Sequence, residues 1–164
     1  MILEQERKEF VQALKSRSYF RFIAAPSQYR ANRLPPASLK SILQMSRVNF
    51  VGDRFPIVPN DDDAFALRGE YLEGLYGGYG TDSAFRIFTS GQFVSLENLH
   101  EDEEDVRERL RNRLEVEEQR KAKMSGFIDF LWTINRFAQF IVFGARFAKA
   151  TGIEESWVIE VSLQ

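Results

Sequence analysis

The stretch from Ser125 to Thr151 constrains the fold of this chain more than any other part of the sequence. It contains no proline, and its apolar residues recur every three or four positions, the period of one face of an α-helix. This stripe comprises positions 127, 130/131, 134, 137/138, 141/142, 145 and 148. Ser125 is a suitable N-cap, and Gly152 is a suitable C-terminal stop. The spacing predicts one long helix, and we expect Phe137 and Ile141 on the stripe to be buried.

Three further phenylalanines, Phe140, Phe143 and Phe147, lie off that stripe, so more than half of the helix circumference is apolar and the helix should be largely buried. The stretch also carries polar residues: Asp129, Asn135, Arg136, Gln139 and Arg146. Ionised side chains are costly inside a bilayer, which argues against a membrane span. Their spacing of three, four or seven predicts a narrow solvent-exposed strip instead.

The composition is that of one globular domain spanning residues 1–164. A hydrophobic content of 44%, with 15 Phe, excludes general disorder. The net charge of −2 gives no overall attraction to nucleic acid or anionic lipid. The chain has no cysteine, which excludes disulfides and thiolate chemistry and is compatible with the cytoplasmic location that we expect. The first residues show no signal-peptide pattern.

The remaining patterns predict short helices and strands around the long helix. The helices are expected at 2–16 and 36–46, and the strands at 18–25, 67–76, 83–89, 92–99 and 157–163. Residues 55–58 lie between prolines and suit an edge strand or a loop, and the charged stretch 101–123 suits a solvated helix or a linker. We therefore predict an α+β fold, with a mostly antiparallel sheet of about five strands packed on one long buried C-terminal helix plus shorter helices.

The pair Ser90-Gly91 predicts a two-residue hairpin turn between the strands at 83–89 and 92–99. Such a turn would place Phe88 opposite Phe93 and Ile87 opposite Val94. One face would then collect the apolar side chains of Phe85, Ile87, Val94 and Leu96, and we expect that face to be buried.

The sequence from Gly77 to Thr81, Gly-Gly-Tyr-Gly-Thr, could hold a phosphate through backbone N–H groups. It lacks the Walker and dinucleotide-binding patterns, and a flexible hairpin loop is the favoured interpretation. The ligand-binding alternative is a small-molecule or nucleotide site in an aromatic pocket near Gly77–Gly80. Its candidate residues are Gly77, Gly78, Tyr79 and Arg86.

Arg30 and Arg33, with Lys40 and Arg47 further along, are candidates for contacts with a phosphate or a nucleic-acid backbone. Basic residues at ordinary surface density are the favoured interpretation. Because the net charge is −2, we expect no strong nucleic-acid binding by this chain alone.

Catalytic and metal-binding patterns are weak. His100 is the only histidine and has no triad-like partners, and Asp61, Asp62 and Asp63 lack the spacing of a calcium loop. An enzyme would have to rely on Glu70, Glu73, Asp82 or His100. We predict no catalytic residue, no metal and no cofactor.

The segment 85–96, Phe-Arg-Ile-Phe-Thr-Ser-Gly-Gln-Phe-Val-Ser-Leu, precedes an acidic run at 101–105 and the long apolar helix. This order resembles the C-terminal accessory region of bacterial proteins that carry an N-terminal Schlafen-type AlbA domain, a DNA- or ATP-binding type. That domain is not visible in residues 1–60, so DNA or ATP binding is not carried over. The resemblance implies a piece of a larger protein.

From these patterns we predict a non-enzymatic accessory, sensing or protein-interaction domain of a bacterial multidomain protein. Its expected partner is another protein or a second copy of itself, with no membrane association. A small ligand is the alternative.

Overall fold

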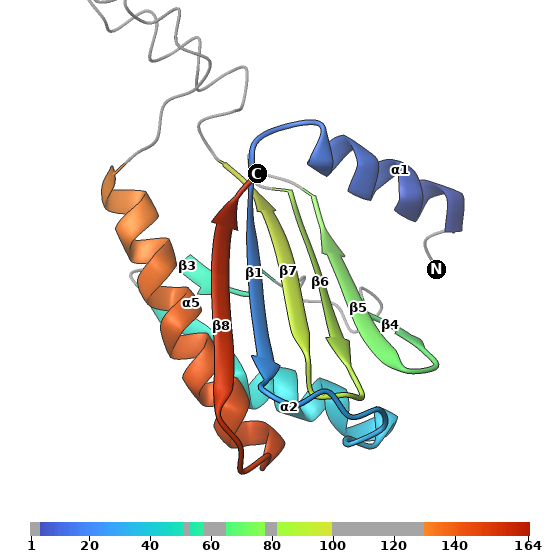
Figure 1. The fold of residues 1–164 in the computed structure, drawn as a ribbon. Helices are drawn as coiled ribbons and strands as arrows, with labels where there is room; N and C mark the ends of the chain where they lie inside the picture. The colour runs from blue at the N-terminus through green and yellow to red at the C-terminus, as the bar shows by residue number, and fades with distance from the viewer. Residues whose placement is uncertain (1–3, 51–52, 58–64, 78–81, 100–129) are drawn as a thin grey trace, which may run out of the picture.

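The computed structural model describes residues 4–50, 53–57, 65–77, 82–99 and 130–164 (Figure 1). The helices are α1 (Glu4–Lys15), α2 (Leu39–Ser46) and α5 (Phe130–Thr151), and the short 3-10 helix η1 (Pro36–Ser38) leads into α2. The strands are β1 (Tyr19–Pro26), β2 (Val48–Phe50), β3 (Asp53–Phe55), β4 (Phe65–Arg68), β5 (Tyr71–Tyr76), β6 (Ser83–Phe88), β7 (Phe93–Asn98) and β8 (Trp157–Leu163). The predicted α+β class is confirmed. The charged stretch 101–123 lies outside the described residues.

The main sheet has six strands in the order β4-β5-β6-β7-β1-β8, and every neighbouring pair is antiparallel (Figure 1). One face of this sheet packs against α5, α2 and the small β2-β3 hairpin, and we call it the covered face. The opposite face, here the open face, meets α1 at one end only (Figure 1). The predicted single strand 67–76 is divided between two strands, β4 and β5. Gly69 adopts φ +59° and turns the chain between them.

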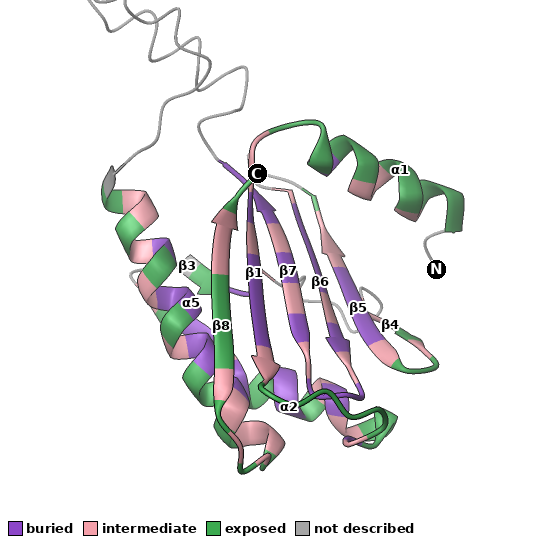
Figure 2. Cartoon of the chain, in the orientation of Figure 1, coloured by how far each residue is buried: buried purple, intermediate pink, exposed green. Residues whose placement is uncertain are grey.

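Phenylalanine rings fill the space between the covered face and α5. Figure 2 shows buried stretches on the central strands and on α5. The Phe143 ring of α5 is fully buried. Its centroid lies 4.5 Å from that of Phe93, 5.1 Å from that of Phe55 and 5.6 Å from that of Phe147. Aromatic pairs at these separations add to the stability gained from buried area. This cluster fixes how α5 sits against the sheet.

The prediction for the buried side of α5 was wrong. Phe137 is 37% exposed and Ile141 is 58% exposed, whereas Phe140, Phe143 and Phe147 are buried. The helix carries two apolar stripes, and the one with three large aromatic rings at i, i+3 and i+7 removes more apolar area from water. The other stripe consequently faces outward.

The polar strip predicted on α5 is only partly solvent-exposed: Arg146 is exposed, but Arg136 and Gln139 are buried. The Arg136 guanidinium forms an ion pair with the buried carboxylate of Glu97 on β7 and donates a hydrogen bond to the Gln139 side chain. It also lies 5.6 Å from the centroid of the Phe55 ring. Arg136 is thus part of the interior, where its charge is neutralised by Glu97.

The predicted hairpin exists, but its register differs by one residue. Ile87 pairs with Phe93 and Arg86 with Val94, because three residues, 89–91, connect the strands. The amide of Phe88 donates to the carbonyl of Gln92 over 2.8 Å, and Gly91 has φ +86°, as three-residue loops require. A shift of one residue exchanges the faces of a strand. The prediction that Val94 and Leu96 share a buried face with Phe85 and Ile87 was therefore wrong.

Candidate functional site

The shifted register gives the open face a mixed charged and apolar character. Strand pairing places Glu73 opposite Arg86, Arg86 opposite Val94, and Val94 opposite Ile23. The next row contains Leu96 opposite Arg21. Charged and apolar side chains thus lie next to one another on neighbouring strands of one surface.

Glu73 organises the charges at this surface. Its side chain is nearly buried, and its carboxylate accepts hydrogen bonds from Arg86 Nε at 2.8 Å and from Arg7 Nη1 at 3.0 Å. Arg68 Nε lies 3.7 Å from the same carboxylate. Arg7 also bonds Glu4, and this hydrogen bond lowers the pKa of the Glu4 carboxyl. Glu73 therefore acts as a structural anion that ties α1 to the sheet.

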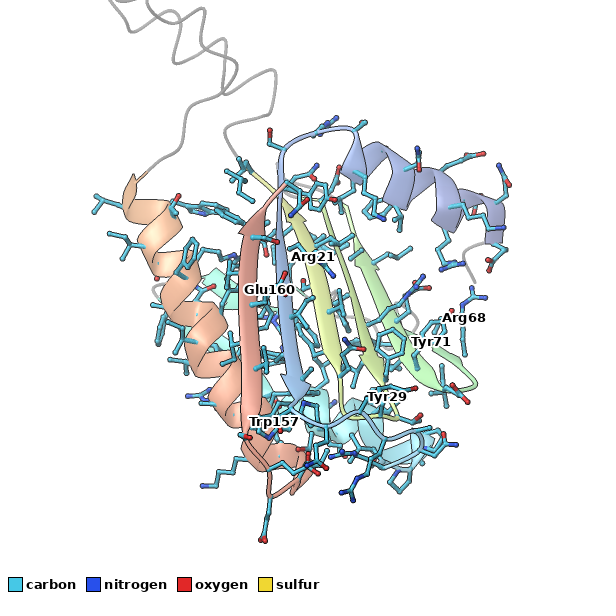
Figure 3. All side chains as sticks on the ribbon, viewed as in Figure 1. Arg21, Tyr29, Arg68, Tyr71, Trp157 and Glu160 are labelled. Carbon is cyan, nitrogen blue, oxygen red and sulfur yellow. The ribbon has the colours of Figure 1, made fainter. Side chains whose placement is uncertain are left out.

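A cavity of about 440 Å³ lies between α1 and the open face. Val11 and Lys15 of α1 contribute to one side of its lining, and the strands contribute the other. The cationic side chains of Lys15, Arg21 and Arg86 line it together with the carboxylate of Glu73. Apolar lining comes from Ala84, Val94 and Leu96, among others. Figure 3 shows Arg21 and Glu160 projecting from the face of the sheet turned to the viewer.

The structure locates the predicted ligand-binding residues in different ways. Arg86 lines the cavity, while Gly77 follows β5 and is exposed. Gly78 and Tyr79 lie outside the described residues, as do Asp61, Asp62, Asp63 and His100. The aromatic pocket near Gly77–Gly80 stays a prediction.

Arg30 and Arg33 both approach one carboxylate, that of Glu155 in the turn before β8. Arg33 Nη1 lies 3.0 Å from Glu155 Oε1, and Arg30 Nη2 lies 4.0 Å from the same oxygen. Arg33 also donates to the backbone carbonyl of Gln28. The Arg33 side chain is only 10% exposed, so its charge is engaged in holding the loop after β1.

The other two members of the predicted basic cluster are also in contact with the fold. The Lys40 ammonium lies 5.6 Å from the centroid of the Phe65 ring. Burial lowers the pKa of the Arg47 guanidinium, with a smaller contribution from the charge of Arg54.

We expect this chain alone to bind duplex DNA no more tightly than about 10⁻⁴ M at physiological salt, because its net charge of −2 leaves little counterion release. A mobility-shift titration over a range of salt concentrations measures this. Micromolar affinity with a steep salt dependence, lost in the double variant Arg30→Glu/Arg33→Glu, would contradict the expectation.

A second candidate surface is formed by α5 and β8. Seven of the ten exposed large hydrophobic side chains among the described residues lie on these two elements. They are Leu131, Ile134, Phe137, Ile141, Val158, Ile159 and Leu163. The two elements lie side by side at one end of the sheet, and exposed residues follow the outer side of the helix (Figure 2). Exposed apolar side chains concentrated on neighbouring elements in this way mark interaction sites.

Sequence reasoning missed Lys15, Arg21, Val94 and Leu96 as neighbours of Arg86. Their meeting depends on the hairpin register and on which face α1 covers. A three-residue loop ending in Gly91 places Val94 beside Arg86. Considering this loop length as well as the two-residue turn would have predicted the pairing from the sequence.

No helix within the described ranges is long and apolar enough to cross a membrane. Among the same residues, no three His, Cys, Asp or Glu side chains gather as a metal site would require.

No family model matches this chain, and neither the curated proteins nor the solved structures compared with it gave a match.

Proposed function

We propose that this domain is a non-enzymatic interaction module that self-associates through the α5–β8 surface. The observation that carries the proposal is the concentration of exposed apolar side chains on α5 and β8. The resemblance of residues 85–96 to the accessory region of bacterial proteins with a Schlafen-type AlbA domain supports an accessory or sensing role in a larger cytoplasmic protein.

The outward stripe of α5 has the spacing of a helix-pairing surface. Positions 131, 134, 138, 141, 145 and 148 alternate intervals of three and four and carry Leu, Ile, Ala, Ile, Ala and Ala. Intervals of three and four keep one seam facing a partner helix. The alanines permit close approach of two helices. We therefore take a second α5 as the partner for this seam.

The edge strand β8 supports a second copy of this chain as the partner. It has seven residues and contains neither lysine nor proline, the usual protections of a sheet edge. The other edge strand, β4, has four residues and ends at Arg68. Antiparallel pairing of two β8 strands about an axis perpendicular to the sheet would keep both covered faces on one side. The two α5 helices would then meet across the same axis.

We expect concentration-dependent dimers in sedimentation equilibrium, and we expect Ile134→Asp and Ile141→Asp each to weaken dimerisation at least about tenfold, roughly 1.4 kcal/mol. Both side chains are more than half exposed, so the charge should not disturb the core. The matched control is Leu67→Asp, since Leu67 is 54% exposed on β4 at the opposite edge. A wild-type chain that stays monomeric at high concentration, or a control that dissociates as the variants do, would refute self-association through this surface.

A further inference from the structure

The cavity beneath α1 has the size and lining of a small-molecule site. Its volume of about 440 Å³ lies within the range of about 300–1,000 Å³ that is usual for such pockets. We infer that it binds an organic anion, a carboxylate or phosphate group carried on an apolar body. This inference is independent of the proposed self-association, because the cavity opens on the face of the sheet that α5 does not cover.

The charges around the cavity favour an anion. Three cationic side chains line it, from Lys15, Arg21 and Arg86, against the single carboxylate of Glu73. Glu73 already accepts hydrogen bonds from Arg86 and from Arg7, which lies outside the lining. Its negative charge is therefore neutralised mainly within this buried cluster. The cavity retains a positive excess that an anionic ligand would balance.

Arg86 is held in place for such a ligand. Its Nε donates to Glu73 at 2.8 Å, and its guanidinium carbon lies 4.9 Å from the centroid of the Tyr71 ring. Within the part of the chain that the structure describes, its two terminal nitrogens make no hydrogen bond. A guanidinium fixed through Nε presents the terminal pair to a carboxylate or phosphate in a bidentate arrangement.

Two further cations are available beside Arg86. Lys15 at the end of α1 is exposed and makes no ion pair within the described ranges. Arg21 Nη1 lies 3.4 Å from Glu160 Oε1, but the two side chains are 43% and 51% exposed. Exposed ion pairs of this kind contribute little to the stability of the fold. Arg21 can therefore turn from Glu160 to a ligand at small cost.

The apolar part of the lining requires an apolar ligand body. Val94 and Leu96 of β7 and Ala84 of β6 contribute to it from the sheet, and Val11 contributes from α1. Val94 and Leu96 face the open side because of the observed hairpin register. A purely inorganic anion would leave them in contact with water, whereas an alkyl or aromatic body would cover them.

Octanoate and octyl phosphate are suitable probes, with 1-octanol as the neutral comparator and inorganic phosphate as the anion without an apolar body. We expect both amphipathic anions to bind in calorimetric titrations, and the tighter of the two identifies the preferred head group. Methyl signals of Val11, Val94 and Leu96 in NMR spectra should shift on binding, and those of Ile134 and Ile141 should not.

The variants separate the charge requirement from folding. Arg86→Gln should weaken octanoate binding about tenfold, because one bidentate charged contact is lost. Lys15→Gln removes an unpaired surface charge without touching the core. It should weaken binding about threefold, because one exposed charge contributes little to the binding free energy. Lys149→Gln on α5 is its matched control and should leave affinity unchanged.

Four results would overturn the inference. They are no binding of either amphipathic anion, equal binding of octanol, equal binding of inorganic phosphate, and ligand-induced shifts confined to the isoleucines of α5. A wild-type chain that binds octanoate but stays monomeric at high concentration would reject the proposed function alone.

Discussion

Phe143→Ala is expected to lower the free energy of unfolding by about 3–5 kcal/mol. The Phe143 ring is fully buried and lies within 6.1 Å, centroid to centroid, of Phe22, Phe55, Phe93 and Phe147. Truncation leaves a cavity that these surrounding rings cannot fill without leaving their own contacts. Urea denaturation followed by circular dichroism measures the change.

The matched control is Ile141→Ala, two residues before Phe143 and on the outward stripe of the same helix. Ile141 is 58% exposed, so its truncation should cost less than about 1 kcal/mol in the monomer. The comparison is made at a protein concentration where the chain is monomeric. Equal losses from the two variants would mean that α5 is rotated relative to the arrangement described above.

The second large effect is expected from Arg136→Met, which should destabilise the fold by about 3–5 kcal/mol. The substitution removes the cationic Arg136 side chain from the carboxylate of Glu97, which is only 1% exposed. It also removes the hydrogen bond to the Gln139 side chain. Thermal and urea denaturation give the loss in stability.

The double variant Arg136→Met/Glu97→Leu distinguishes an uncompensated charge from lost packing. With both charges removed, most of the stability should return, because an apolar pair of similar volume avoids the cost of burying ions. Arg21→Met, which breaks the exposed pair with Glu160, should change stability by no more than about 1 kcal/mol. A double variant as unstable as Arg136→Met would show that the charge of Glu97 is not the cause.

Much of the fold follows from periodicity and turn residues in the sequence. Over the described residues, the long helix at Phe130–Thr151, the strand at Tyr19–Pro26 and the alternating strand at Trp157–Leu163 form as their patterns predict. These features are local, because they depend on residues within one element. The fold class follows from them.

The orientation of α5 could not be decided in this way. Both stripes, the one with Phe137 and the one with Phe143, satisfy the helical period. The choice between them depends on the fit of three rings against β1 and β7, and on the position of Glu97 opposite Arg136. Neither contact is local in sequence.

The cavity could not be predicted from the sequence either, although Arg86 was predicted as a ligand-binding residue. A hairpin loop of two or three residues is compatible with Ser90-Gly91, yet only the longer one places Val94 beside Arg86. Lys15 reaches the same cavity only because α1 packs on the open face. Recognising this group of residues requires tertiary structure.

The central position of β1 has a consequence for the order in which the chain folds. β1 pairs with β7 on one side and with β8 on the other, and the contact between Arg21 and Glu160 spans 139 positions. The β4–β7 meander, in contrast, joins strands that are close in sequence. Long-range pairing is slow because a large loop must close first. We therefore expect the β4–β7 meander to form first and β1 to pair with β7. The other edge of β1 should stay unpaired until β8 has been synthesised.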